Sequence, residues 1–290
     1  MFPTPTFCFY SADSINSIPF TTSERILVQF ILDAPEKVIY LSPKELAEAS
    51  FVSISTIYRL ITKLKLDGLN DLKLELVKYL NAHSSEPIID INYPISSEDT
   101  NFSIMKNLQL VYEQTVQSTI DTNEFENLSV NRTLLQEAET IDIYATSANI
   151  YFAENFKFQM QEIGKTVNVP QDNYTQHLTA ANSTTNHLAI IVSFEGRGGN
   201  IPELFAILKQ NKCKILLITS KNSPLLKEAV DSTFLFSSLE NHYHKISSFS
   251  TRMSLMYLFD MLYLSYFNID YEKNSAYKLA NYQKMNPRLI

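Results

Sequence analysis

The segment Ser42–Lys65 (SPKELAEASFVSISTIYRLITKLK) constrains the fold of this chain most, because it predicts two short helices joined by a tight turn. Ser42-Pro43-Lys44-Glu45 is a capping box with proline in the first helical turn, so one helix begins there. Phe51-Val52 forms the turn, and Ser53 can cap the next helix. An apolar stripe at helical spacing then faces inward: Ile57, Leu60, Ile61 and Leu64. Two such helices joined by a turn of about three or four residues predict a helix-turn-helix.

The opposite side of the second helix carries hydroxyl and basic side chains. No acidic residue lies between Glu48 and Asp67, so this side bears no negative charge. Hydroxyl and cationic groups bond phosphates and base edges, and a helix that buries its other face suits the DNA major groove. The candidate DNA-binding residues are Ser53, Ser55, Thr56, Tyr58, Arg59, Thr62 and Lys63. The alternative is a generic three-helix bundle, since short amphipathic helices are common.

The charge of the chain limits what kind of DNA contact is possible. The chain of 290 residues has a formal charge of −7, and residues 1–82 hold eight Lys and Arg against nine Asp and Glu. A protein that binds polyanions without selectivity is normally basic overall. Any DNA contact is therefore expected to be local, through the second helix of the pair.

Cysteine usage and hydropathy predict a cytoplasmic protein. Cys8 and Cys213 fit neither a disulfide framework nor a metal-binding spacing, which favours a reducing compartment. The N-terminus lacks the basic and apolar regions of a signal peptide. The most apolar helical stretch, Met253–Phe267, is shorter than the roughly 20 residues that span a bilayer.

The organisation of the chain predicts two domains. Residues 1–82 are expected to be all-α, with a first helix after the capping box at Thr21 and a fourth from about Leu69 to Asn81. Residues 83–100 are rich in proline, serine and acids, which is typical of a linker. Beyond residue 140, short apolar strands (Ile141–Ala145, Val167–Val169, Leu188–Ser193, Ile215–Thr219, Thr233–Phe236) alternate with helices (Phe152–Ile163, Ile201–Gln210, Leu225–Val230). This alternation predicts an α/β fold, a doubly wound, flavodoxin-like parallel sheet covered on both faces.

Several motifs resemble a known family. Phe20–Arg25 (FTTSER), Leu46–Glu48 (LAE), Val52–Arg59 (VSISTIYR) and Leu64–Lys73 (LKLDGLNDLK) resemble the N-terminal domain of RpiR-type (MurR/RpiR) transcription regulators. Lys214–Thr219 with Ser223–Leu225, and Ser250–Arg252 through Asp260–Tyr263, resemble the sugar isomerase (SIS) domain of that family. The resemblance implies that residues 1–82 bind double-stranded operator DNA. It also implies that residues 101–290 form an SIS-like domain that binds a sugar-phosphate effector and mediates oligomerisation, in a regulator of carbohydrate metabolism.

Oligomerisation is expected because paired operator half-sites need two recognition helices. The sequence predicts a homodimer or homotetramer, and the apolar helix Lys245–Asn268 is the candidate interface.

The expected effector motifs depart from the family pattern. Ala145–Asn149 (ATSAN) stands where family members carry Gly-x-Gly-x-Ser, and Ser193–Gly198 (SFEGRG) stands where they carry Ser-x-Ser-Gly-x-Thr. A carboxylate at Glu195 would repel a phosphate unless Arg197 or a proton compensates. The candidate ligand-binding residues are Ser147, Asn149, Ser193, Glu195, Arg197 and Ser223. Either the pocket survives with altered specificity or the domain now mainly dimerises, and weak or absent phosphosugar binding is expected.

An SIS-type phosphosugar isomerase is the alternative from a different class. Such chemistry needs a carboxylate or histidine beside the reacting carbon, and Glu195, His242 and His244 are the groups that could act. A His-x-His pair in a loop is more often solvated surface, and it lacks a third ligand for a metal. The sequence therefore predicts a non-enzyme with no catalytic residue, metal or cofactor.

Overall fold

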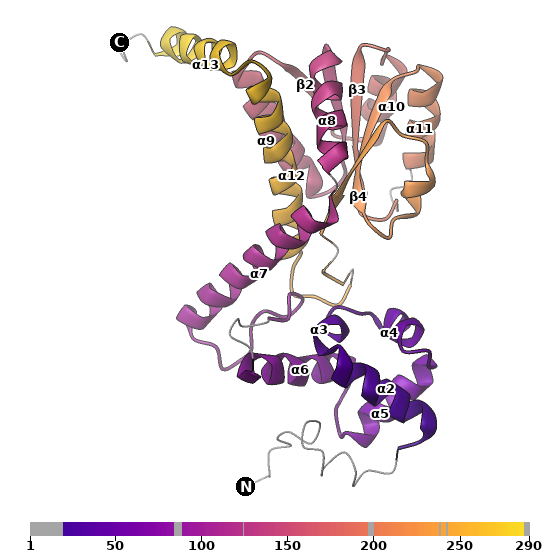
Figure 1. The fold of residues 1–290 in the computed structure, drawn as a ribbon. Coiled ribbons are helices and arrows are strands. Elements are labelled where there is room, and N and C mark those ends of the chain that lie inside the picture. The colour runs from indigo at the N-terminus through magenta and orange to yellow at the C-terminus, as the bar shows by residue number, and fades with distance from the viewer. Residues whose placement is uncertain are drawn as a thin grey trace. The chain divides into compact units, whose positions relative to one another are not determined.

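The computed structural model describes residues 20–83, 89–123, 125–196, 200–237, 239–241 and 243–286, with the side chains of residues 78, 79, 81–83, 125 and 126 left aside (Figure 1). The chain divides into two compact units. The first comprises Met1–Val111 and Leu239–Ser247, and the second comprises Tyr112–Ser238 and Ser248–Ile290. Within the described residues, no helix is both long and apolar enough to cross a bilayer.

The first unit is helical, as predicted. Its helices are α2 (Thr22–Asp33), α3 (Pro35–Val38), α4 (Pro43–Ala49), α5 (Ile54–Lys63) and α6 (Leu69–His83). Both expected capping boxes are present: the Thr21 and Ser42 hydroxyls accept the amides of Glu24 and Glu45, whose carboxylates accept the cap amides in return. The apolar stripes of α2, α4, α5 and α6 meet in one core, built from Leu27, Ile31, Leu46, Ile57, Leu60, Leu72 and Leu76.

The region expected to be a linker is irregular but partly buried. Residues 84–88 lie outside the described part, and residues 89–92 form neither helix nor strand. Asp90 and Asn92 are nonetheless buried, and Asn92 accepts the backbone amides of Asn241 (2.7 Å) and Ile246 (2.9 Å). These residues therefore pack within the first unit. The expected domain boundaries at residues 82 and 100 stay predictions, and α7 (Asn101–Thr122) contributes to both units.

The second unit is the predicted doubly wound α/β fold. Five parallel strands pair in the order β2-β1-β3-β4-β5. The strands are β1 (Thr140–Tyr144), β2 (Thr166–Asn168), β3 (His187–Val192), β4 (Lys214–Ser220) and β5 (Ser232–Phe236). The helices are α8 (Phe125–Glu137), α9 (Asn149–Glu162), α10 (Asn173–Ala181), α11 (Ile201–Gln210), α12 (Phe249–Phe267) and α13 (Tyr271–Met285), with 3-10 turns η1 (Pro224–Lys227) and η2 (Asn268–Asp270).

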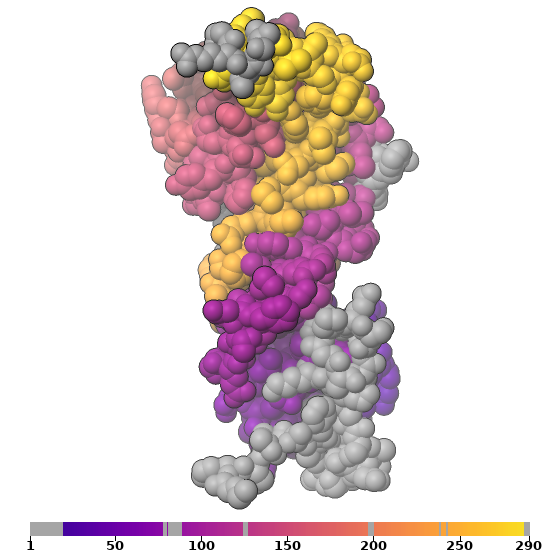
Figure 2. Space-filling view, turned by 90° about the vertical axis from the view of Figure 1, so that its left-hand side faces the viewer, coloured from indigo at the N-terminus to yellow at the C-terminus, as the bar shows by residue number. Residues whose placement is uncertain are grey.

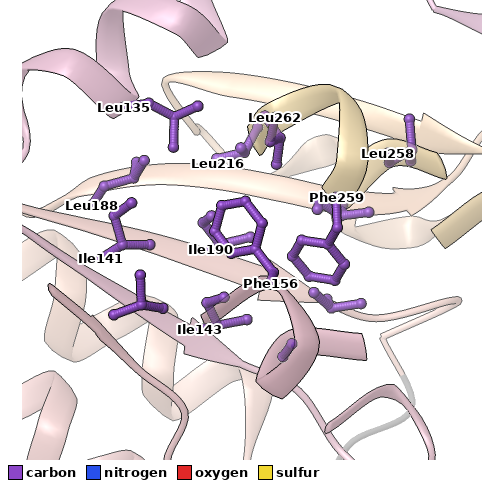
Figure 3. Packing of buried hydrophobic residues seen from close by; sticks show 14 of the residues in the cluster. Leu135, Ile141, Ile143, Phe156, Leu188, Ile190, Leu216, Leu258, Phe259 and Leu262 are labelled. Atoms are coloured by element: carbon purple, nitrogen blue, oxygen red, sulfur yellow. The ribbon is translucent and has the colours of Figure 1, made fainter. Parts of the chain in front are cut away.

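Both faces of the sheet are covered by helices, which explains why its strands are almost uninterrupted apolar runs. Alternate side chains of the strands point to opposite faces. On one face they meet α8, α9 and α12, where the rings of Phe156 and Phe259 pack with centroids 5.2 Å apart (Figure 3). On the other face Ile191 and Leu217 meet α10 and α11.

This topology creates a switch point between β1 and β3. The chain leaves β1 into α9 on one face and leaves β3 into α11 on the other face. In open α/β sheets the loops after two such strands diverge and leave a crevice at their carboxyl ends, where ligands bind. The loops here begin at Ala145 and Ser193, which are the expected effector motifs.

Lys65 occupies a backbone conformation that favours glycine, because its φ is +58°. Lys65→Gly is expected to stabilise the first unit by about 0.5–1 kcal/mol, since relief of the left-handed strain exceeds the entropy that glycine adds to the unfolded chain. Native-state hydrogen exchange of α5 amides in the full chain measures this. Lys65→Ala is the matched control, because alanine removes the charge and keeps the strain. Equal exchange in the two variants would contradict the prediction.

Candidate functional site

Helix α5 begins with a cluster of hydroxyl groups. Ser53 lies at the N-cap, as predicted, and its Oγ accepts the Thr56 amide at 3.2 Å. The same Oγ lies 2.8 Å from Ser55 Oγ and 2.9 Å from Thr56 Oγ1. The hydroxyls at the start of the helix therefore bond largely to one another, and they fix the first turn of α5 against the preceding turn.

Six of the seven candidate DNA-binding residues are exposed: Ser53, Ser55, Tyr58, Arg59, Thr62 and Lys63. Thr56 is the exception, and its placement on the exposed side of the helix was wrong, because only 2% of the residue is accessible. It lies one turn before the buried Leu60, and its hydroxyl belongs to the cap cluster. Arg59 Nη2 donates to Thr56 Oγ1 at 3.1 Å. Thr56 thus orients Arg59 instead of facing solvent.

The Lys63 side chain is 35% exposed, but its ammonium group is engaged. Its Nζ donates to Oε2 of Glu24 at 2.5 Å, and the Glu24 side chain is 1% exposed. The same carboxylate accepts the Thr21 amide at 2.8 Å. Burial acts to raise the pKa of Glu24, but the hydrogen bonds from Lys63 and Thr21 outweigh it and hold the pKa below its usual range. Lys63 therefore ties α5 to the start of α2.

Two exposed residues beside this surface escaped the sequence analysis as functional candidates. Phe51, in the turn, is 92% exposed with φ +55°, and Ile54, at the first position of α5, is 43% exposed. The signal for Ile54 was present in the spacing, because it lies one turn before Tyr58 and outside the apolar stripe. For Phe51 the sequence offered only the turn itself.

The candidate effector residues in the second unit gather at one edge of the sheet. Ser147 and Asn149 follow β1, Ser193 and Glu195 follow β3, and Ser223 follows β4. Since these three strands are parallel neighbours, the loops that follow them lie at the same carboxyl edge. Arg197 lies outside the described residues.

The residues after β1 are the accessible part of this edge. Ser147 is exposed and adopts φ +53°, a conformation that glycine adopts without cost. Asn149 is half-buried as the first residue of α9. The N-cap of α9, Ala148, offers no side-chain bond, and the first amides of the helix make only short-range turn bonds of 3.2–3.3 Å. Uncapped helix N-termini of this kind attract anions.

The residues after β3 and β4 are mostly engaged in local structure. Ser193 Oγ accepts the Gly196 amide at 3.0 Å, and Ser223 Oγ accepts the Leu225 amide at 3.2 Å. Both serines are buried, whereas Glu195 is half-buried. Thr219 in β4 donates to the Ser193 carbonyl at 2.7 Å and so fixes the start of this loop.

A buried amide network, which the sequence did not predict, supports this edge of the sheet. Gln176 in α10 is 1% exposed and donates to the Ala145 carbonyl at 2.9 Å. Its Oε1 accepts Nδ2 of Asn200, the N-cap of α11, at 2.6 Å. Gln176 thus joins the end of β1 to the start of α11. Gln176 was not a candidate, because α10 itself was not predicted.

The groups considered for catalysis fall in different compact units or outside the described residues. His244 is exposed and belongs to the first unit, whereas Glu195 belongs to the second. His242 lies outside the described residues. Among the residues that the structure describes, no three His, Cys, Asp or Glu side chains gather closely enough to hold a metal ion.

Comparison with known proteins matches both halves of the chain. The helix-turn-helix domain of the rpiR family matches residues 15–83, and the SIS domain matches residues 134–265. An HTH-type transcriptional regulator of Caldanaerobacter subterraneus is 25% identical over 248 residues, which cover 86% of each chain. The HTH-type transcriptional regulator HexR of Escherichia coli is 24% identical over 211 residues, or 71% of this chain and 70% of HexR.

A solved structure shares the fold over nearly the whole chain. The Vibrio vulnificus NanR protein, solved as a complex with ManNAc-6P, aligns with a TM-score of 0.58 at 18% identity and covers 95% of this chain and 96% of NanR. Sequence motifs, fold and relatives agree. The chain is a transcriptional regulator of the rpiR family, in which a helix-turn-helix domain is followed by an SIS domain.

Proposed function

We propose that this regulator binds operator DNA through α5 and acts in the cytoplasm on genes of carbohydrate metabolism. The observation that carries the proposal is the exposed side of α5, where Arg59 stands among hydroxyl groups and no carboxylate occurs from residue 49 to residue 66. Ser53, Ser55, Tyr58, Arg59 and Thr62 contact phosphates or base edges. Thr56 and Lys63 contribute indirectly: Thr56 orients Arg59, and Lys63 holds α5 through its ion pair with Glu24.

Dimerisation would bring two copies of α5 to two half-sites of an operator. The interface that we propose lies on α12 and α13, which together form much of one face of the second unit and are coloured yellow in Figure 2. Large apolar side chains remain exposed there, among them Leu264 (58%), Tyr271 (59%) and Leu279 (59%). Apolar surface of this kind on a soluble fold is typical of a subunit contact.

We infer that the crevice after β1 and β3 takes a small polar effector and holds phosphosugars weakly or not at all. The NanR protein, which shares this fold and is solved with ManNAc-6P, supports a small polar effector. Two features argue against strong phosphate binding: Ser147 stands with φ +53° in a loop without glycine, and the Glu195 carboxylate lies on the neighbouring loop. Calorimetric titration with ManNAc-6P and hexose phosphates is expected to give no saturable binding. Micromolar affinity for any of them would overturn this part of the proposal.

The experiment that tests the DNA-binding proposal is sequencing of genomic fragments retained by the purified protein. A small set of promoters is expected, with genes of sugar transport or sugar metabolism beside them. A uniform distribution of fragments would contradict operator recognition. The genes beside these promoters also identify the pathway, and this readout does not require that the effector is known.

A further inference from the structure

The start of the recognition helix exposes three large apolar side chains that lie outside the core of the first unit. Phe51 in the turn is 92% exposed, Ile54 is 43% exposed and Tyr58 is 47% exposed. Ile54 and Tyr58 lie one turn apart on the same side of α5. Phe51 also holds a left-handed backbone conformation at φ +55°, which costs a non-glycine residue free energy. Exposed apolar groups at a strained turn indicate a binding site for a partner.

The occupant that this surface fits is the major groove of DNA. In a helix-turn-helix the N-terminal part of the recognition helix faces the base edges. The segment from residue 49 to residue 66 contains no acid and carries Arg59 and Lys65, besides Lys63, which is paired with Glu24. Its charge therefore complements a polyanion. A contact with a protein partner or a second copy of the chain would favour a purely apolar patch. Here the polar residues Ser53 and Ser55 border Ile54.

The hydroxyl groups beside these residues use part of their hydrogen-bonding capacity within the protein. The hydroxyls of Ser53, Ser55 and Thr56 are bonded to one another at 2.8–2.9 Å. The apolar feature of a base pair in the major groove is the C5 methyl group of thymine, and apolar side chains recognise it. On this ground Ile54 and Tyr58 can add selectivity for thymine to the polar contacts of the hydroxyl groups.

We propose that Ile54 and Tyr58, with Phe51 beside them, read thymine methyl groups, so that each operator half-site contains A·T pairs at fixed positions. The inference rests on the proposed operator binding and specifies the class of sequence that the helix prefers. A contact that buries one methyl group changes affinity about fourfold, since burial of such a group stabilises by about 0.8 kcal/mol.

The test uses the full chain and an operator fragment from the genomic selection. Each thymine of a half-site is replaced in turn by uracil, which removes the methyl group and keeps every hydrogen-bonding atom of the base. We expect about fourfold weaker binding at one or more fixed positions, measured by fluorescence anisotropy at constant salt. Ile54→Ala is expected to lose this sensitivity at its own position. Leu74→Ala on α6, where Leu74 is similarly exposed at 41%, should keep it.

The outcomes separate this inference from the function on which it rests. Binding of the operator with no uracil effect at any position would overturn the inference and leave operator binding intact. Absence of sequence-selective binding by the wild-type chain would overturn both. A change in oligomeric state of Ile54→Ala, with its uracil sensitivity retained, would assign the patch to a protein contact and also overturn the inference. The uracil series on the wild type needs no variant, so misfolding cannot obscure it.

Discussion

Arg59→Ala is expected to lower operator affinity about five- to 160-fold, because a positioned arginine in a recognition helix contributes about 1–3 kcal/mol to a base contact. Arg59 is exposed, and its guanidinium is already oriented by the Thr56 hydroxyl at 3.1 Å. A side chain that is held in place before binding loses little conformational entropy when the contact forms. Fluorescence anisotropy with an operator fragment at constant salt measures the loss.

Arg25→Ala is the matched control for this experiment. Arg25 is also exposed in the first unit, but it lies on α2 and its Nε donates to the Phe20 carbonyl at 3.4 Å. We expect a change of less than about threefold for this variant, which reflects only the general loss of one positive charge. Equal losses for Arg25→Ala and Arg59→Ala would contradict a specific role of Arg59. So would an Arg59→Ala chain that binds the operator as tightly as the wild type.

The part of the fold that local patterns encode was predictable. Some features depend only on residues that are close together in the sequence: both capping boxes, the Ser53 cap and the five apolar strands. The structure confirms them. The expected helix Leu225–Val230 was wrong, because the chain forms only the 3-10 turn η1 and Glu228 is already extended with φ −71° and ψ 138°. Helix α10 was missed, although Asp172 begins it with a capping box.

The site depended more on contacts that are distant in sequence. Lys63 looked like a free cation on a polar helix face, since nothing within α5 reveals that Glu24, 39 residues earlier, reaches its ammonium group. Thr56 looked exposed for the same reason, because the cap cluster that buries it forms only when the turn closes. The side-chain amides of Gln176 in α10 and Asn200 at the start of α11 bond to each other, and no spacing of residues in the sequence indicates this contact.

The second large effect concerns the ion pair that holds the recognition helix. Lys63→Met is expected to destabilise the first unit by about 2 kcal/mol, because it leaves the Glu24 carboxylate buried without its cation, held by the Thr21 amide of its own capping box. Methionine keeps the length and the apolar stem of lysine, so packing changes little. Native-state hydrogen exchange of amides in α2 and α5 of the full chain measures the loss locally.

Double substitution provides the control for this experiment. Glu24→Gln combined with Lys63→Met removes both charges, and it is expected to recover much of the stability that Lys63→Met loses. The loss in free energy of unfolding of the double variant is compared with the sum of the losses of the two single variants. A larger loss in the double variant would show that the pair is not the origin of the effect.

The pH dependence distinguishes a lost ion pair from a simple packing defect. In the wild type the pKa of Glu24 lies below its usual value of 4.5, because the bonds from Lys63 and Thr21 outweigh burial. The carboxylate therefore contributes stability that is present above pH 4.5 and is lost as the pH falls through the lowered pKa. In Lys63→Met burial is no longer outweighed, the pKa of Glu24 rises, and its protonation then relieves the penalty. The stability gap between wild type and variant should thus narrow as the pH is lowered from neutral towards 4.5. A gap that stays constant over this range would assign the loss to packing and exclude the buried carboxylate as its cause.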